Sequence, residues 1–235
     1  MRTRIAEKEN ITVKSTGQAR RAFLVYTLTA ALVGSLAAAS LAAPPAGQGP
    51  KATPQTPPTR EVATFAAGCF WSMEAIFKQL KGVEKAEPGY AGGKVAKPSY
   101  EQVETGTTGH AESLNITYDP KVITYRDLLE VLLTVRNPTT PNKQGPDEGP
   151  QYRFIIFYRN EAQHKAATEA IQKFNKDRVW PKPIVAEVAP YSNFYKAEDY
   201  HFDYYNLHPN ESYCRYVIAP EIAEFRSKFK SKLKH

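Results

Sequence analysis

Two cysteines, Cys69 and Cys214, are the residues of this 235-residue chain best suited to nucleophilic or redox chemistry. Cys69 lies between a strand-like stretch that ends in Gly68 and an amphipathic segment, so we expect it at the start of a helix. A helix N-terminus presents unpaired N–H groups and a partial positive charge, which stabilise an anion. The Cys69 thiol should therefore ionise readily and act as a nucleophile. The alternative is a non-enzymatic binding module with a structural Cys69–Cys214 disulfide.

Seven segments around and beyond Cys69 resemble those of peptide methionine sulfoxide reductases of the A class. They are residues 66–74 (AAGCFWSME), 89–93 (GYAGG), 98–103 (PSYEQV), 106–112 (GTTGHAE), 145–153 (GPDEGPQYR), 197–201 (AEDYH) and 208–210 (HPN). The resemblance covers roughly residues 61–215. It implies a thiol-dependent oxidoreductase that converts methionine sulfoxide, free or in proteins and as the S epimer, to methionine. A different cysteine-dependent redox enzyme, such as a thiol peroxidase, is the alternative reading.

The resemblance also implies roles for matching residues. Cys69 would attack the sulfoxide sulfur, and Phe70 and Trp71 would form an apolar wall for the S-methyl group. Glu112 would protonate the departing oxygen. Tyr100 and Tyr152 would hold that oxygen by hydrogen bonds, and Asp147 would order a water beside it.

Elementary chemistry agrees with an acid at Glu112. A sulfoxide oxygen leaves poorly until it is protonated, so a carboxylic acid must lie near the reacting sulfur. Burial would raise the pKa of that carboxyl group and keep its proton available near neutral pH. Phenols add hydrogen bonds without adding charge. Without the resemblance, a surface carboxylate at Glu112 and packed tyrosines at 100 and 152 would be the simplest readings.

Cys214 is the candidate resolving cysteine, because it follows Tyr213 as the recycling cysteine does in many relatives. Those relatives continue into a glycine-rich tail, whereas here residues 215–218 (RYVI) are strand-like and residues 220–233 predict a helix. A cysteine held in a strand could not swing easily to Cys69, so both outcomes stay open. Pro146, Pro150, Phe154 and Phe202 also depart from the family pattern.

The predicted elements alternate between strands and helices. We expect strands at residues 61–67, 83–87, 113–118, 154–158 and 184–189, and helices at 71–80, from Thr124 to about 136, and from Asn160 to about 175. Loops are expected at 88–93 and 138–150, the second being long enough to suggest function. This order predicts an α/β two-layer sandwich with a mixed sheet, a ferredoxin-like core with long functional loops.

The first 59 residues do not belong to that domain. A basic start and the apolar run at 23–43 predict a signal peptide over 1–43, cut near Ala42 for export to the periplasm or medium; an uncleaved membrane anchor is the alternative. Residues 44–59 are a proline-rich linker, which leaves 60–235 as the catalytic domain. Residues 1–59 carry +5 of the formal net charge of +7, so the basic balance does not indicate nucleic acid.

Cofactor and partner expectations follow from the same residues. The histidines lack the spacing of a dedicated metal site, so we expect neither metal nor organic cofactor. No histidine is clearly placed as the base that an acyl transferase would need. The expected partners are methionine sulfoxide and a thioredoxin-like thiol donor, with the protein acting as a monomer.

Overall fold

The structure is a computed structural model that describes residues 60–234. The predicted leader and linker, residues 1–59, lie outside the described part of the chain. Six strands form one sheet in the order β7 (Glu187–Pro190), β6 (Ile155–Tyr158), β1 (Glu61–Ala66), β3 (Ala111–Tyr118), β2 (Val83–Ala91) and β8 (Phe194–Lys196). The β6–β7 pair is parallel and every other neighbouring pair is antiparallel, so the sheet is mixed as predicted.

The ferredoxin-like core is visible in the connectivity. The chain runs β1, α1 (Phe70–Phe77), β2, β3, α3 (Tyr125–Val135), β6, and the four strands lie in the order β6-β1-β3-β2. This is the split βαββαβ arrangement. After β6 the chain forms α4 (Glu161–Lys176) and then β7, which adds a parallel strand at one edge of the sheet. Strand β8 adds a strand at the other edge. The predicted fold class is confirmed.

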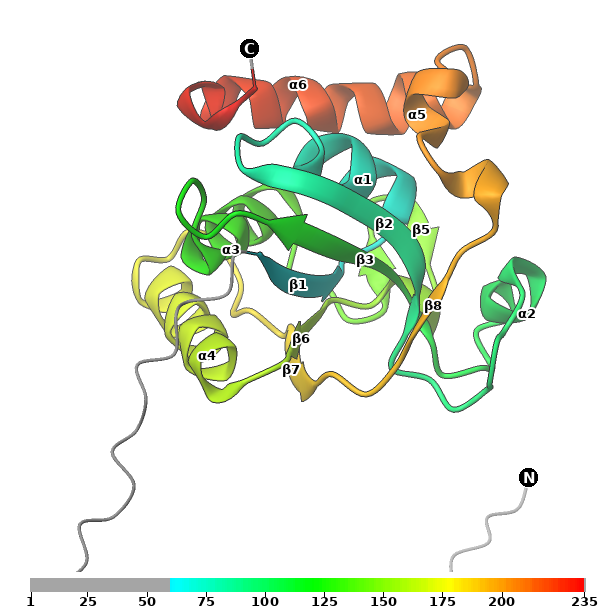
Figure 1. The fold of residues 1–235 in the computed structure, drawn as a ribbon, viewed down its shortest axis with the longest axis horizontal. Helices are drawn as coiled ribbons and strands as arrows, with labels where there is room; N and C mark the ends of the chain where they lie inside the picture. The colour runs from blue at the N-terminus through cyan, green and yellow to red at the C-terminus, as the bar shows by residue number, and fades with distance from the viewer. Residues whose placement is uncertain (1–59, 235) are drawn as a thin grey trace, which may run out of the picture. The chain divides into compact units, whose positions relative to one another are not determined.

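One hydrophobic core joins the helices to one face of the sheet. Buried side chains of the sheet, such as Phe65, Leu114 and Ile156, belong to the same cluster as Met73, Ile76 and Phe77 of α1, and α3 and α4 add to it. The cluster also takes in α6 (Ala219–Lys228), which lies alongside α1 in Figure 1. Strands β1, β2 and β3 thus form a packed layer, and the residues near Cys69 lie at the ends of these strands.

Local signals identified the starts of α3 and α4. Thr124 and Asp127 form the predicted capping box at the start of α3, with N–H donations of 3.1 and 2.9 Å to each other's side chains. Asn160 caps α4 by accepting the N–H of Gln163 at 2.9 Å. Helix α1 ends at Phe77, three residues earlier than predicted.

Several segments differ from the sequence prediction. Residues 88–91 continue β2, because their backbone pairs with both β3 and β8, whereas a loop was expected. The loop at 138–150 contains a short hairpin, β4 (Lys143–Gln144) and β5 (Asp147–Glu148). The strand predicted at 184–189 begins only at Glu187. The strand-like residues 215–218 belong to a π-helical turn, η3 (Cys214–Ile218), that leads directly into α6.

Two short helices were not expected. α2 (Tyr100–Glu104) stands apart from the helical layer in Figure 1, and α5 (Tyr204–Leu207) lies near the start of α6. Ser99 and Gln102 form a capping box that starts α2. Both helices carry side chains of the candidate site described below.

Candidate active site

Cys69 is the N-cap residue of α1, as the sequence predicts. Gly68 before it has a φ of +76°, and a Cβ there would lie 2.5 Å from Gln144 and 2.6 Å from Arg136, so only glycine fits this turn. The backbone N–H groups of Trp71 and Ser72, at the start of α1, act on the pKa of the Cys69 thiol by favouring the thiolate.

The prediction that the Cys69 thiol ionises readily is nevertheless wrong for this state of the protein. The side chain is only 6% exposed. Burial raises the pKa of the Cys69 thiol well above its usual value, and the negative charges of Glu112 and Asp147 add to the rise. The two N–H groups at the helix terminus oppose this rise without overcoming it.

Glu112 is a buried carboxyl group next to the start of α1. It lies on β3 opposite Tyr90 of β2, and only 2% of it is exposed. The backbone N–H of Phe70 donates to its Oε2 at 2.9 Å, which joins it to the residue after Cys69. Burial, followed by the charges of Glu104 and Asp147, raises the pKa of Glu112 well above its usual value. The alternative of a surface carboxylate is therefore wrong, and the raised pKa favours the protonated form that an acid requires.

Tyr100 and Tyr152 lie close enough to this carboxyl group for its charge to act on both phenols. Tyr100 opens α2, and its N–H donates to Glu198 at 2.9 Å, which anchors the helix. Tyr152 ends a 3₁₀ turn, η1 (Pro150–Tyr152), in which Pro150 occupies the first position, where its missing N–H costs nothing. Burial and the charge of Glu112 raise the pKa of both phenols, so they remain hydrogen-bond donors.

Asp147 is the acid of the β4–β5 hairpin, and its Oδ2 accepts a 2.6 Å hydrogen bond from the Tyr213 hydroxyl. Burial, together with the charge of Cys69, raises the pKa of Tyr213. Burial raises the pKa of Asp147, although its bond with Tyr213 and the charge of Arg136 oppose the rise. Pro146, whose position departs from the family pattern, lies in the turn between β4 and β5.

The two rings after Cys69 differ in accessibility. Phe70 is fully buried among Tyr90, Val103 and Ala197, whereas Trp71 is half-buried and reaches the surface. Trp71 stacks on Tyr204 with ring centroids 3.7 Å apart and planes 7° apart. Trp71 is therefore the ring that a bound methyl group can reach directly, and Phe70 packs beneath it.

His201 fixes the orientation of Trp71. The Trp71 indole N–H donates to His201 Nδ1 at 3.0 Å. Burial lowers the pKa of His201 to about 4, so the imidazole is neutral near pH 7 and Nδ1 can accept this bond. Its other nitrogen, Nε2, is buried and 3.7 Å from the Glu198 carboxylate.

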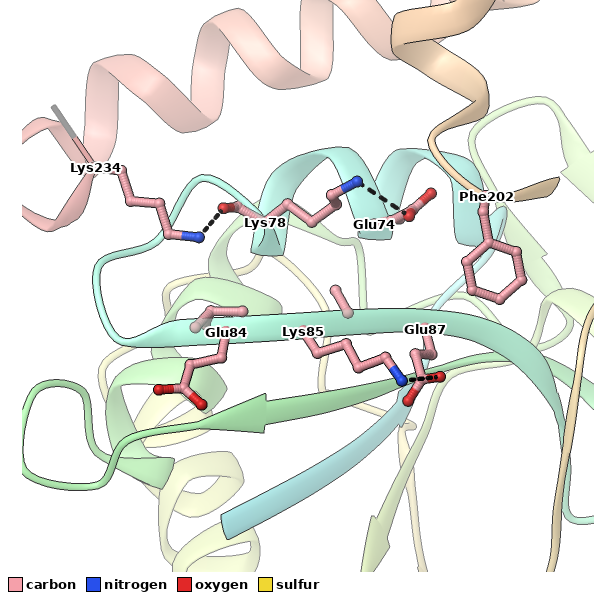
Figure 2. Close-up of a pocket in the computed structure, with 9 residues that line it drawn as sticks. Glu74, Lys78, Glu84, Lys85, Glu87, Phe202 and Lys234 are labelled. Carbon is pink, nitrogen blue, oxygen red and sulfur yellow. Dashed lines mark hydrogen bonds and ion pairs between the residues drawn. The ribbon is translucent and has the colours of Figure 1, made fainter. Parts of the chain in front are cut away.

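Hydrogen bonds join the segment that carries His201 and Tyr204 to α1. Figure 2 shows Glu74 and Lys78 on successive turns of α1, joined by a 3.5 Å ion pair, with Phe202 close by. Glu74 accepts the N–H of Asp203 at 2.8 Å, and Lys78 donates to the Asp203 carboxylate at 2.7 Å. These bonds hold Asp203 in the left-handed conformation, with a φ of +59°, from which α5 starts.

Arg136 is a buried cation behind Cys69 that the sequence reading missed. It is 1% exposed, and its Nε donates to the carbonyl of Ala67 at 2.8 Å. Its Nη1 donates to Ser72 Oγ at 3.1 Å and to Glu221 of α6 at 2.5 Å. It ends α3, and no local sequence signal distinguishes it from a surface arginine.

Cys214 is fully buried in the main hydrophobic core, and both cysteines are free thiols. It directly follows Tyr213, whose hydroxyl donates to Asp147 of the candidate site. Burial raises the pKa of the Cys214 thiol. The structural Cys69–Cys214 disulfide of the non-enzymatic alternative is thus not present.

The fold brings all the predicted catalytic and substrate-binding residues to one place. They come from the start of α1, from α2, from β3, from the hairpin at 143–148 and from η1. Sequence reasoning missed Glu104, Tyr213 and Glu198, which contact them, and Arg136, which bonds to Ala67 and Ser72 on either side of Cys69. Among residues 60–234 no cluster of three or more metal-ligating side chains occurs, and no helix within them is long and apolar enough to cross a membrane.

Comparison with known proteins places this constellation in a family. The sequence profile of peptide methionine sulfoxide reductases matches residues 61–233. The chain belongs to that family.

Relatives and solved structures agree with the assignment. A peptide methionine sulfoxide reductase MsrA of Sulfolobus acidocaldarius is 52% identical over 172 residues, which cover 73% of this chain and 97% of the relative. The reduced form of Mxr1 from Saccharomyces cerevisiae has a TM-score of 0.63 and 35% identity, covering 68% of this chain and 92% of that one. Methionine sulfoxide reductase A of Corynebacterium diphtheriae also has a TM-score of 0.63, with 30% identity, covering 68% and 79%. The protein is thus an oxidoreductase that reduces methionine sulfoxide with a thiol.

Proposed function

We propose that Cys69 attacks the sulfur of the S epimer of methionine sulfoxide, free or in proteins, while Glu112 protonates the leaving oxygen. The products are methionine and Cys69 sulfenic acid. The observation that carries this proposal is the buried Glu112 carboxyl group, held 2.9 Å from the N–H of Phe70 beside the nucleophile. Its raised pKa keeps a proton available for the oxygen.

Five neighbouring side chains complete the proposed site. Tyr100 and Tyr152 hold the substrate oxygen, and Asp147 orders a water next to it. Trp71 is the wall for the methyl group, with Phe70 packed behind it. Because every one of these residues comes from a single chain, we also propose that the protein acts as a monomer.

The resting thiol has a raised pKa, so substrate binding must favour the thiolate. Protonated Glu112 no longer contributes the negative charge that opposes ionisation of Cys69. The N–H groups of Trp71 and Ser72 then remain as local stabilisers of the thiolate. Attack and protonation are therefore coupled through Glu112.

We propose that Cys214 resolves the sulfenic acid. Its thiol condenses with Cys69 sulfenic acid to give a Cys69–Cys214 disulfide and one water. A thioredoxin-like dithiol donor then reduces the disulfide to two thiols and is itself oxidised. The support is the position of Cys214 next to Tyr213, whose hydroxyl donates to Asp147 of the site.

We further propose that the protein works outside the cytoplasm. The support is the basic start and apolar run of residues 1–43, with small residues around Ala42. The alternative is that residues 23–43 stay attached as a membrane anchor. In either case the linker at 44–59 would separate the leader from the domain.

Substitution of Cys69 by serine tests the central step. Cys69→Ser should abolish release of methionine in a single turnover, because a hydroxyl group cannot replace the thiolate at the sulfoxide sulfur. The variant should keep its circular dichroism spectrum. A Cys69→Ser protein that still reduces methionine sulfoxide would refute the proposed function.

A further inference from the structure

His201 is a fully buried residue that contacts three of the proposed substrate-binding side chains. Its ring centroid lies 4.9 Å from that of Phe70 and 4.5 Å from that of Tyr100. Its Nδ1 accepts the indole N–H of Trp71 at 3.0 Å. One imidazole ring therefore supports both the proposed wall for the methyl group and a phenol proposed to hold the oxygen.

The bond with Trp71 fixes the tautomer of His201. An indole nitrogen only donates, so Nδ1 must be unprotonated and the neutral ring carries its proton on Nε2. This Nε2 is buried without a hydrogen-bond partner in the described part of the chain, and Glu198 Oε2 lies 3.7 Å from it. The Glu198 carboxylate is itself held by the N–H of Tyr100, which donates to Oε1 at 2.9 Å. The negative charge of Glu198 favours the Nε2–H tautomer, which is the one that can accept from Trp71.

Three neighbours hold the Trp71 side chain in place. One face of the indole stacks on Tyr204, with ring centroids 3.7 Å apart, and Tyr213 lies nearly perpendicular to it at 6.2 Å. The bond to His201 is the directional contact of the three. Stacked rings can slide and turn in their own planes, whereas a hydrogen bond weakens steeply when its angle changes. His201 therefore determines how the indole edge is oriented.

We propose that His201 is a positioning residue that, by holding Trp71, limits the pocket for the S-alkyl group to a methyl group. This inference rests on the proposed role of Trp71 as the wall for that group. A longer alkyl chain has to displace the indole ring, and a fixed ring resists displacement. One methylene group in an apolar pocket changes kcat/KM by roughly 10–200-fold.

The specificity ratio measures this restriction. It is kcat/KM for free methionine S-sulfoxide divided by kcat/KM for free ethionine S-sulfoxide. His201→Phe keeps a ring between Phe70 and Tyr100 but removes the acceptor, so we expect the ratio to fall by about 10-fold. For the methionine substrate KM should rise with little change in kcat, because the wall binds substrate and transition state alike.

His201→Asn is the conservative variant that should rescue the ratio. Its side-chain amide oxygen can take the place of Nδ1 and accept from Trp71. His164→Phe is the matched control, since His164 of α4 also stacks on a tyrosine, Tyr158, with centroids 4.4 Å apart, and lies outside the site. It should leave the ratio unchanged.

Nuclear magnetic resonance of the indole N–H groups gives a readout that does not depend on turnover. The chain has two tryptophans, so protein labelled with ¹⁵N-tryptophan should give two indole signals. That of Trp71 is assigned by its loss in Trp71→Ala. Trp180, which donates to the Leu133 carbonyl at 2.8 Å, is the internal reference. In His201→Phe the proton signal of Trp71 should move upfield and that of Trp180 should stay, and His201→Asn should return the Trp71 signal towards its original position.

The variants separate this inference from the proposed function. An unchanged specificity ratio in Trp71→Ala would refute Trp71 as the wall for the methyl group. A ratio that falls in Trp71→Ala but not in His201→Phe would refute the role of His201 alone, as would an unmoved Trp71 signal in His201→Phe. Equal losses in His201→Phe and His201→Asn would overturn the hydrogen bond as the cause. A lower ratio with a shifted Trp71 signal in His201→Phe, both recovered in His201→Asn, supports the proposal.

Discussion

The proposed roles of Cys69 and Glu112 require opposite protonation states. The nucleophile must lose its proton and the acid must keep one, and burial raises the pKa of both groups. The population of the active form, with Cys69 ionised and Glu112 protonated, thus depends on both titrations. Activity should therefore pass through a maximum with pH, and the two limbs of the bell-shaped profile belong to the coupled Cys69–Glu112 pair.

Glu112→Gln should lower the single-turnover rate by about 10²–10⁴-fold, the usual contribution of a general acid. The loss should be smaller at low pH, where solvent protons partly replace the missing acid, and greatest at neutral and higher pH. Rapid-quench measurement of released methionine across the pH range gives the profile. A variant with the wild-type rate and profile would move the acid role to Tyr100 or Tyr152.

At the scale of elements, the C-terminal helix is joined to the active site by one buried ion pair. Arg136 contacts Ala67, Ser72 and Glu221, so it connects the end of β1, the start of α1 and α6. The Arg136 side chain is 2% exposed and that of Glu221 is 24% exposed. Removing one partner leaves a charge buried without compensation, which is costly.

Glu221→Ala should therefore lower the free energy of unfolding by about 3 kcal/mol. The matched control is Glu224→Ala on the same helix, which breaks only an exposed pair with Lys228 and should cost less than about 1 kcal/mol. Urea denaturation monitored by circular dichroism measures both. Equal losses in the two variants would contradict the buried-pair account.

The π-helical turn at Cys214–Ile218 is the element that must move if Cys214 is to reach Cys69. A disulfide needs the two Cα atoms within about 7 Å, and Cys214 is packed in the core. A π-helical turn is rarer and less regular than the α-helix that follows it, and such turns often occur at functional sites. We expect this turn, rather than α6 itself, to open.

Cys214→Ser should still release one methionine per enzyme in a single turnover, because Cys69 is intact. Repeated turnover should stall with a thioredoxin-like protein as donor and continue with dithiothreitol, which reduces the sulfenic acid directly. The comparison of steady-state rates with the two donors decides the matter. Wild-type rates with both would exclude the resolving role.

At the scale of the whole molecule, the catalytic residues all lie in residues 60–234, and the first 59 residues contain the predicted signal peptide and linker. Full-length protein expressed in a bacterium with a periplasm should be cut near Ala42. Intact mass and N-terminal sequencing of the purified protein locate the cut. An uncut chain in the membrane fraction would favour the anchor.

The fold could be predicted from the sequence where the signals are local. Apolar periodicity identified α1, α3 and α4, and the caps at Thr124 and Asn160 fixed where α3 and α4 begin. Residues 215–218 were misread because four residues with alternating side chains fit a strand and a helical turn equally well. Residues 88–91 were misread because proline and glycine usually end strands, and only pairing with β3 and β8 on both sides keeps this segment extended.

The sequence by itself determined the chemistry, because Cys69 and Glu112 lie in motifs whose residue types leave few alternatives. Only the tertiary structure decided the energetics of that chemistry. The raised pKa values of Cys69 and Glu112 and the buried pair of Arg136 with Glu221 depend on residues far apart in the chain. Burial and charge act through space, and spacing along a sequence does not record which distant groups will share a low-dielectric site.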